Sequence, residues 1–191
     1  MRFVHLIRHG KPRSSWGDVQ ADPDPGLDEE GHAQARDVAA QLLALPPAQR
    51  PARVLSSPLR RCRETAQPTA DALGVSVEIE PAVSEIPTPS GIPAGLRGDW
   101  LRKAFAGRWD EIEGDLDYAA WAGNVATATA CHPGAAIFSH FVAINAVVGA
   151  AVGDPRVRQF EPGHTSVTTF EVVDGGLRLI ETGATATTQV L

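Results

Sequence analysis

Short apolar runs that end abruptly at polar residues constrain the fold of this chain more than any other feature of its sequence. Runs of this length suit β-strands that are buried on both faces, as the strands of a parallel sheet are. The sequence therefore predicts strands at residues 3–7, 53–56, 75–79 and 135–139, of which 75–79 shows the alternating pattern of a strand.

Helical periodicity separates these strands. After Asp28, a candidate N-cap, apolar residues recur at spacings of three and four as far as Pro46. A second amphipathic pattern ends at Gly74, a residue typical of helix C-termini. The predicted helices are 28–45, 59–73, part of 118–129, and 141–152.

A hairpin is predicted near the end of the sequence. Two runs, 167–173 and 177–182, flank Asp174-Gly175-Gly176, which is a turn sequence typical of hairpins. Alternating strands and helices followed by a hairpin indicate an α/β fold. We therefore expect a three-layer α/β/α sandwich around a mostly parallel sheet.

The length of 191 residues and the apolar content of 43% suit one domain with a substantial core. Residues 86–107 are dense in proline and glycine and show no clear period. A stretch of this kind between two predicted strands is typical of an insertion. We expect a single domain over 1–191, with a cap or lid inserted around residues 86–130.

The charge balance and the cysteines limit the possible partners and the location. With 17 basic and 23 acidic side chains, the net charge is −6, which argues against nucleic-acid binding through a basic surface. No apolar run reaches the roughly 18 residues of a membrane span, and the first residues lack the features of a secretory signal. Cys62 and Cys131 form no CxxC pair. These features predict a cytoplasmic protein with no membrane partner; they leave its oligomeric state open.

Residues that suit phosphate binding follow three of the predicted strands. Arg8-His9-Gly10 follows the first, the segment RRCR at 60–63 follows the second, and His140 follows the fourth. In an open α/β sheet, ligands bind beyond the carboxyl ends of the parallel strands. We therefore expect these side chains to converge, although they are far apart in the sequence.

Four motifs, in order, resemble those of the histidine phosphatase superfamily, in its phosphoglycerate mutase-like branch 1. Residues 6–10 (LIRHG) are similar to its Arg-His-Gly signature, and residues 26–35 (GLDEEGHAQA) to its LTxxGxxQA helix start. Residues 56–66 (SSPLRRCRETA) are similar to SSPLxRAxxTA, and Ser139-His140 to a late Ser-His-Gly element. The resemblance covers residues 3–152 and implies the α/β fold predicted above.

The resemblance also implies a role for each matched residue. His9 would be the nucleophile that forms a phosphohistidine, and Arg8 and Arg61 would bind the phosphoryl oxygens. His140 would contact the phosphoryl group from the other side and stabilise its charge. Glu85 would be the acid that protonates the leaving oxygen.

Three features of the sequence make it less direct to assign the family's roles to these residues. Glu78 and Glu80 lie close to Glu85 in the sequence, so each is an alternative acid. Lys11 follows the signature where the family often has a small or acidic residue; it is expected either to bind an anionic substrate or to face solvent. Phe141 replaces the family's glycine and is expected to narrow the pocket.

These residue types suit phosphoryl transfer on physical grounds as well. A neutral imidazole can attack phosphorus when a hydrogen bond to its other nitrogen sets the tautomer. Arginine forks match phosphate oxygens, and a carboxyl group among apolar neighbours can hold a proton near neutral pH. Together with the resemblance, this predicts a phosphatase that hydrolyses small phosphomonoesters through His9, without a metal ion or other cofactor.

Two other functions stay open from the sequence. One is a mutase that returns the phosphoryl group to another hydroxyl, and the other is a phospholigand-binding module without catalysis. The remaining histidines lack motif support and are expected to be structural or at the surface: His5, His32, His132 and His164. For His164, which follows Glu161-Pro162-Gly163 in a predicted loop, contact with the site is the alternative.

Overall fold

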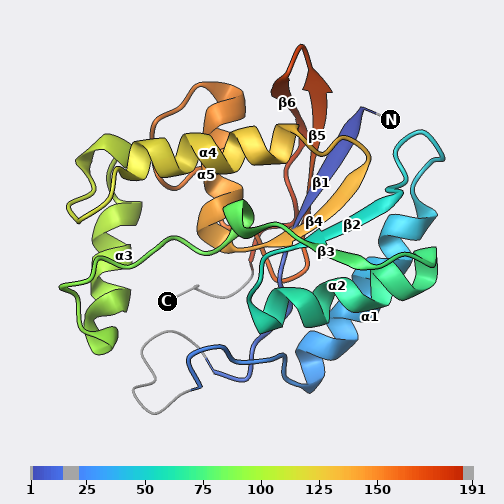
Figure 1. Cartoon of the computed structure of the whole chain (residues 1–191), viewed down its shortest axis with the longest axis horizontal. Helices are drawn as coiled ribbons and strands as arrows, with labels where there is room; N and C mark the ends of the chain where they lie inside the picture. The colour runs from blue at the N-terminus through green and yellow to red at the C-terminus, as the bar shows by residue number, and fades with distance from the viewer. Residues whose placement is uncertain (1, 15–21, 187–191) are drawn as a thin grey trace.

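A mixed sheet lies at the centre of the computed structural model, which describes residues 2–14 and 22–186 (Figure 1). Within these ranges six strands are arranged in the order β3-β2-β4-β1-β5-β6. The first four in this order are parallel, and β5 and β6 are antiparallel. This arrangement confirms the predicted mostly parallel sheet with a terminal hairpin. The strands are β1 (Phe3–Arg8), β2 (Arg53–Ser56), β3 (Val77–Ile79), β4 (Ala135–Ser139), β5 (Val167–Val173) and β6 (Gly176–Glu181).

Helices cover both faces of the sheet (Figure 1). Alternate residues of β4 show the two faces, because Ala136 and Phe138 join a core with α1 and α2 whereas Ala135 and Ile137 join a core with α4 and α5. The predicted three layers are therefore confirmed. In the part of the chain that the structure describes, no helix is long and apolar enough to cross a membrane. The α-helices are α1 (Glu29–Ala44), α2 (Arg60–Leu73), α3 (Arg97–Phe105), α4 (Tyr118–Ala130) and α5 (Phe141–Val152).

Capping interactions set the ends of the first two helices. The Asp28 side chain accepts a hydrogen bond from the Gly31 backbone N–H at the start of α1. Gly74 ends α2 in the left-handed conformation, with φ at 67°, and the Val75 N–H donates to the Ala70 carbonyl. Because that N–H closes the helix, Val75 does not join the sheet. This explains why β3 begins two residues later than the sequence predicts.

The insertion between β3 and β4 is anchored through aromatic side chains. It contains the short 3-10 helices η1 (Pro81–Val83), η2 (Ala94–Leu96) and η3 (Trp109–Glu111), followed by α4. Ring centroids are 5.7 Å apart for both Trp100–Tyr118 and Trp109–Trp121, and 5.3 Å apart for Phe105–Phe141. The last pair joins α3 to α5, so the insertion packs on the sheet's helical layer. Movement of residues 86–130 as a lid stays a prediction.

Candidate active site

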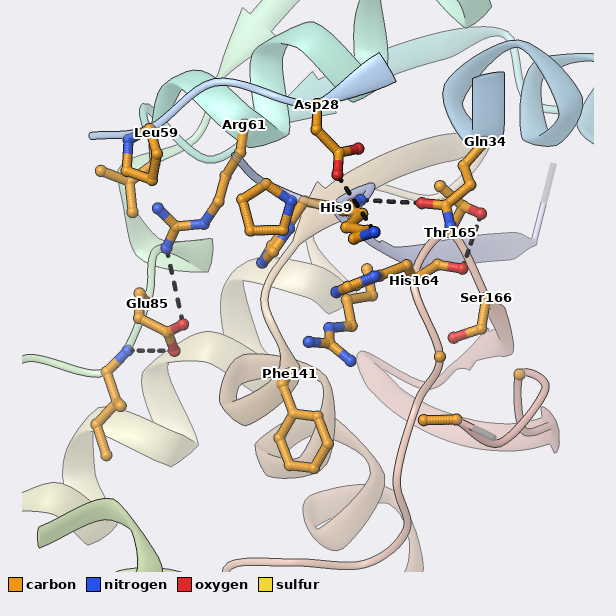
Figure 2. A pocket seen from close by; sticks show the side chains of 18 of the residues that line it. His9, Asp28, Gln34, Leu59, Arg61, Glu85, Phe141, His164, Thr165 and Ser166 are labelled. Atoms are coloured by element: carbon orange, nitrogen blue, oxygen red, sulfur yellow. Dashed lines mark hydrogen bonds and ion pairs between the residues drawn. The ribbon is translucent and has the colours of Figure 1, made fainter. Parts of the chain in front are cut away.

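Side chains from several strand ends converge at one cavity, which Arg8 and Arg61 line and beside which His140 is fully buried. Arg8 is the last residue of β1, His140 follows β4, and Arg61 lies in the first turn of α2 just after β2. Figure 2 shows His9, Arg61 and Glu85 pointing into the same space. The sheet thus brings together residues up to 132 positions apart (8 to 140) at the carboxyl ends of its parallel strands, where an α/β sheet binds ligands.

His9 is buried and has a defined tautomer. Its Nδ1 lies 2.8 Å from the Gly10 carbonyl oxygen, which can only accept, so Nδ1 carries the proton. Burial lowers the pKa of His9 well below its usual value, and the neighbouring His140, Arg61 and Arg8 lower it further. The ring is therefore neutral, and its Nε2 keeps the electron pair that a nucleophile needs.

Gly10 lets the backbone next to His9 lie against α1. A Cβ at this position would come within 2.8 Å of the Gly31 carbonyl oxygen, which is too close for any larger residue. The Gly10 N–H donates to Thr65 Oγ1, 2.9 Å away, and Thr65 donates in turn to the Arg61 carbonyl. This chain of bonds fixes the His9 loop relative to α2.

Arg61 and His140 form a second polar pair beside His9. The ring centroids of His9 and His140 are 5.4 Å apart. Arg61 Nη2 donates to His140 Nδ1 over 3.2 Å, so the proton of the neutral His140 ring is on Nε2, which lies 2.8 Å from Ser57 Oγ. Burial and then the charges of Arg61, Arg8 and Arg97 lower the pKa of His140 well below its usual value.

Arg8 also lines the cavity, and its guanidinium lies over an aromatic ring. Its Cζ is 5.4 Å from the centroid of Phe141, and its Nη1 donates to the Pro162 carbonyl over 2.8 Å. Burial lowers the pKa of Arg8 to about 10, so the side chain stays charged at neutral pH. Phe141, which the sequence analysis expected to narrow the pocket, lines it and packs against Arg8.

Glu85 is the carboxylate that the fold brings to the site. Its Oε2 lies 3.6 Å from His140 Nδ1 and 3.9 Å from Arg61 Nη2. This oxygen makes no hydrogen bond within the described residues, whereas Oε1 accepts one from the Ile86 N–H. The two alternatives lie elsewhere, because Glu78 pairs with Arg53 and Glu80 with His132.

Lys11 lines the same cavity, but two carboxylates already hold its ammonium group. Lys11 Nζ is 2.6 Å from Glu30 Oε2 and 3.4 Å from Asp28 Oδ2, and the side chain is 46% exposed. The hydrogen bond that Lys11 donates to Glu30 and the charge of Asp28 raise the pKa of Lys11. The structure therefore places Lys11 at the solvent-facing side of the cavity, with its charge neutralised locally.

Two further residues lie at the site: His164, for which the sequence favoured a structural role over contact with the site, and Arg97, which the sequence analysis missed. The His164 ring centroid is 5.8 Å from that of His9, and burial followed by the charge of Arg8 lowers its pKa to about 4. Arg97, at the start of α3, donates from Nη2 to the Ile86 carbonyl and lines the cavity. Burial lowers the pKa of Arg97, whereas the charge of Glu85 raises it.

The assembled cavity suits a tetrahedral anion. It has a volume of about 1920 Å³. Three guanidiniums lie near His9 and His140, beside the buried carboxylate of Glu85, which leaves an excess of positive charge at this end of the cavity for a phosphoryl group. Within residues 2–14 and 22–186, no group of three or more His, Cys, Asp or Glu side chains is arranged to hold a metal ion. The three guanidiniums near His9 and His140 belong to Arg8, Arg61 and Arg97.

Curated relatives match parts of the chain. It is 35% identical over 124 residues to the 55 kDa subunit of transcription factor tau from Saccharomyces cerevisiae, a match that covers 56% of this chain and 27% of that protein. It is also 35% identical over 89 residues to a probable phosphoglycerate mutase of Erwinia tasmaniensis, covering 45% of this chain and 39% of that protein. The chain thus spans well under half the length of either relative.

Solved structures and a family model match almost all of it. Phosphoserine phosphatase from Entamoeba histolytica, in complex with 3-phosphoglyceric acid, has a TM-score of 0.75 and 24% identity over 97% of this chain and 98% of that one. Mycobacterial glucosyl-3-phosphoglycerate phosphatase has a TM-score of 0.71 and 20% identity over 97% and 100%. These two likenesses establish a shared fold. The model of the histidine phosphatase superfamily (branch 1) matches residues 4–185, and the chain therefore belongs to this superfamily.

Proposed function

We propose that the protein is a metal-independent phosphatase that hydrolyses small phosphomonoesters through a phosphohistidine on His9. The observation that carries the proposal is the neutral His9 ring, protonated on Nδ1, among the cations Arg8 and Arg61. An unprotonated Nε2 is the nucleophile, and the guanidiniums neutralise the phosphoryl oxygens without a metal ion.

In the first step, His9 Nε2 forms a bond to phosphorus as the bond from phosphorus to the leaving oxygen breaks. Arg8 and Arg61 stabilise the charge on the phosphoryl oxygens, and His140, whose Nδ1 accepts a hydrogen bond from Arg61, positions that guanidinium. Glu85, in its protonated form, transfers its proton to the leaving oxygen, so the alcohol departs neutral. Its Oε2, buried without a hydrogen-bond partner among the described residues, is the atom that would deliver this proton.

In the second step, water attacks the phosphorus of the phosphohistidine. Glu85, now a carboxylate, accepts a proton from the water, the bond from Nε2 to phosphorus breaks, and inorganic phosphate leaves. His9 returns to its neutral form with the proton still on Nδ1. Splitting one displacement into two lowers the barrier of each, because both use the same preorganised cations.

The proposed substrates carry a negatively charged group in addition to the phosphoryl group. Once Glu85 is protonated, the guanidiniums of Arg8 and Arg61 face the two charges of a phosphoryl group, and Arg97 and Arg102 of α3 line the cavity as further cations. Two of the proteins that share the fold are described with phosphorylated acids, phosphoserine and glucosyl-3-phosphoglycerate. Phosphorylated carboxylic acids are therefore the proposed class. Lys11 is expected to contribute less to their binding than Arg97, because Glu30 and Asp28 neutralise it.

The test is phosphate release from a panel of phosphorylated acids, sugar phosphates and an aryl phosphate. His9→Ala is expected to abolish release, and His32→Ala, an exposed histidine outside the cavity, to leave it unchanged. Arg97→Ala is expected to raise KM for phosphorylated acids by about tenfold and to change KM for the aryl phosphate little.

The same assay separates the two alternative functions. An isomerised phosphoester without release of phosphate would identify a mutase. Tight binding of phosphate with no turnover on the whole panel would identify a binding module. Full activity of His9→Ala would contradict the proposed mechanism.

A further inference from the structure

A third imidazole packs against the nucleophile. The planes of His164 and His9 are inclined by 34° with centroids 5.8 Å apart, whereas His140 meets the same ring at 61°. The His164 ring is therefore closer to parallel with the His9 ring than the His140 ring is. Figure 2 shows His164 beside His9 at the cavity wall.

The loop that carries His164 is fastened to the residue before the nucleophile. The Thr165 N–H donates to the Arg8 carbonyl over 3.0 Å, and the Arg8 N–H donates to the Ser166 carbonyl over 3.3 Å. Arg8 also donates from its side chain to the Pro162 carbonyl. Three bonds to one residue hold the His164 ring in register with His9.

This loop contains a backbone conformation that its sequence does not favour. Thr165 is β-branched, yet its φ is 55°, in the left-handed region that such residues avoid. Strained residues of this kind persist where the surrounding bonds hold them, and they concentrate at functional sites. The next residue, Ser166, keeps a buried hydroxyl without a hydrogen-bond partner in the described part of the chain. Both observations indicate a loop shaped for the site rather than for stability.

The charge of His9 changes during the proposed reaction. When Nε2 bonds to phosphorus and Nδ1 keeps its proton, the ring of His9 becomes positively charged. A neutral aromatic face within about 6 Å attracts a cation, whereas a second imidazolium would repel it. Burial and Arg8 keep His164 neutral at neutral pH, so its ring suits the first role.

We propose that His164 is a positioning residue, whose ring face holds the plane of His9 and stabilises the positive charge that His9 carries as a phosphohistidine. The inference rests on the proposed function, because it requires His9 to be the nucleophile. It adds that the aromatic face of His164, rather than its nitrogens, is what the reaction uses.

Two variants separate the aromatic face from simple bulk. His164→Phe keeps a neutral ring, and His164→Leu keeps apolar volume without one. The rate of phosphoenzyme formation is measured by rapid quenching at saturating substrate, together with KM, and thermal unfolding checks that each variant is folded. His164→Phe is expected to stay within about threefold of the native rate, and His164→Leu to be slower by about tenfold, with KM changed less than twofold in both.

The outcomes distinguish this inference from the proposed function. A Phe variant that forms the phosphoenzyme no faster than the Leu variant would overturn the role of the ring face. If His9→Ala is inactive while both variants react at the native rate, only the inference fails. If His9→Ala remains active, the proposed function itself fails.

Discussion

His9, His140 and Arg8 have the protonation states that their proposed tasks require. His9 and His140 are kept neutral because burial and nearby guanidiniums lower their pKa values. The guanidiniums themselves remain charged, since even the lowered pKa of Arg8 is about 10. In the proposed mechanism, Glu85 is the group that exchanges a proton with the leaving oxygen.

Replacing the acid should slow the reaction in a way that depends on the leaving group. Glu85→Gln is expected to slow phosphoenzyme formation from an alkyl phosphomonoester by about 10²–10³-fold, because the alkoxide then leaves without a proton. With p-nitrophenyl phosphate the loss is expected to be smaller by at least about tenfold, since nitrophenolate needs no proton. Rapid quenching with both substrates measures the difference.

Glu78→Gln is the matched control, because Glu78 pairs with Arg53 outside the cavity. It is expected to react as the native protein does with both substrates. An equal loss for the alkyl and the aryl substrate in Glu85→Gln would contradict the assignment of Glu85 as the acid.

Individual elements divide the work of the site between them. The ends of β1 and β4 and the start of α2 carry the residues around the phosphoryl group, and α3 carries Arg97 and Arg102 along the cavity. Because α3 belongs to the insertion, its position depends on the aromatic contacts of Trp100 and Phe105. Substrate binding and chemistry are therefore expected to respond to different elements.

Loosening α3 should weaken binding more than chemistry. Trp100→Ala removes a buried ring that packs on Tyr118 and is expected to cost about 3 kcal/mol of unfolding free energy. It is also expected to raise KM severalfold while kcat changes less than about threefold. Urea unfolding and steady-state kinetics measure the two effects.

Trp109→Ala provides the comparison, because it removes an equally buried ring of the same core cluster that lies in η3 rather than α3. A similar loss of stability with KM near the native value is expected. If both variants raise KM equally, the position of α3 has no specific role in binding.

At the scale of elements, local patterns predicted what local forces determine. The strands, the first two helices and the hairpin follow from periodicity and capping residues such as Asp28 and Gly74. The convergence of His9 and His140 follows from a parallel sheet, whose strand ends share an edge. His164 was assigned a structural role because its place beside His9 depends on β5 pairing with β1, 160 residues earlier, which no local pattern encodes. Arg97 lies in the insertion, where no period marks the helix.

Across the whole molecule, three histidines are buried in their neutral form, one within a strand and two just after strand ends. His5 lies in β1, where Nε2 donates to the Gln49 carbonyl and burial lowers its pKa. His9 and His140 have pKa values lowered by the same main cause. In the unfolded chain all three regain a pKa of about 6.5. The unfolded chain therefore binds more protons than the folded protein below that pH.

The free energy of unfolding should consequently fall as the pH is lowered through 6.5. The stability due to the neutral histidines is present above this value and is lost below it, until the lowered pKa values are reached. Between pH 7.5 and 5.5 we expect a loss of about 2–4 kcal/mol, mostly before carboxylates titrate. Urea unfolding at the two pH values measures it, and equal or greater stability at pH 5.5 would contradict the neutral state of these rings.

The most direct test of the central claim is to identify the residue that carries the phosphoryl group. The protein is mixed with a substrate, quenched with alkali within one turnover, digested, and mapped by mass spectrometry. We predict one phosphoryl group on the peptide that contains His9, stable to alkali, lost in acid, and absent from His9→Ala. A phosphoryl group on another residue, or one that survives acid and is lost in alkali, would contradict the phosphohistidine mechanism.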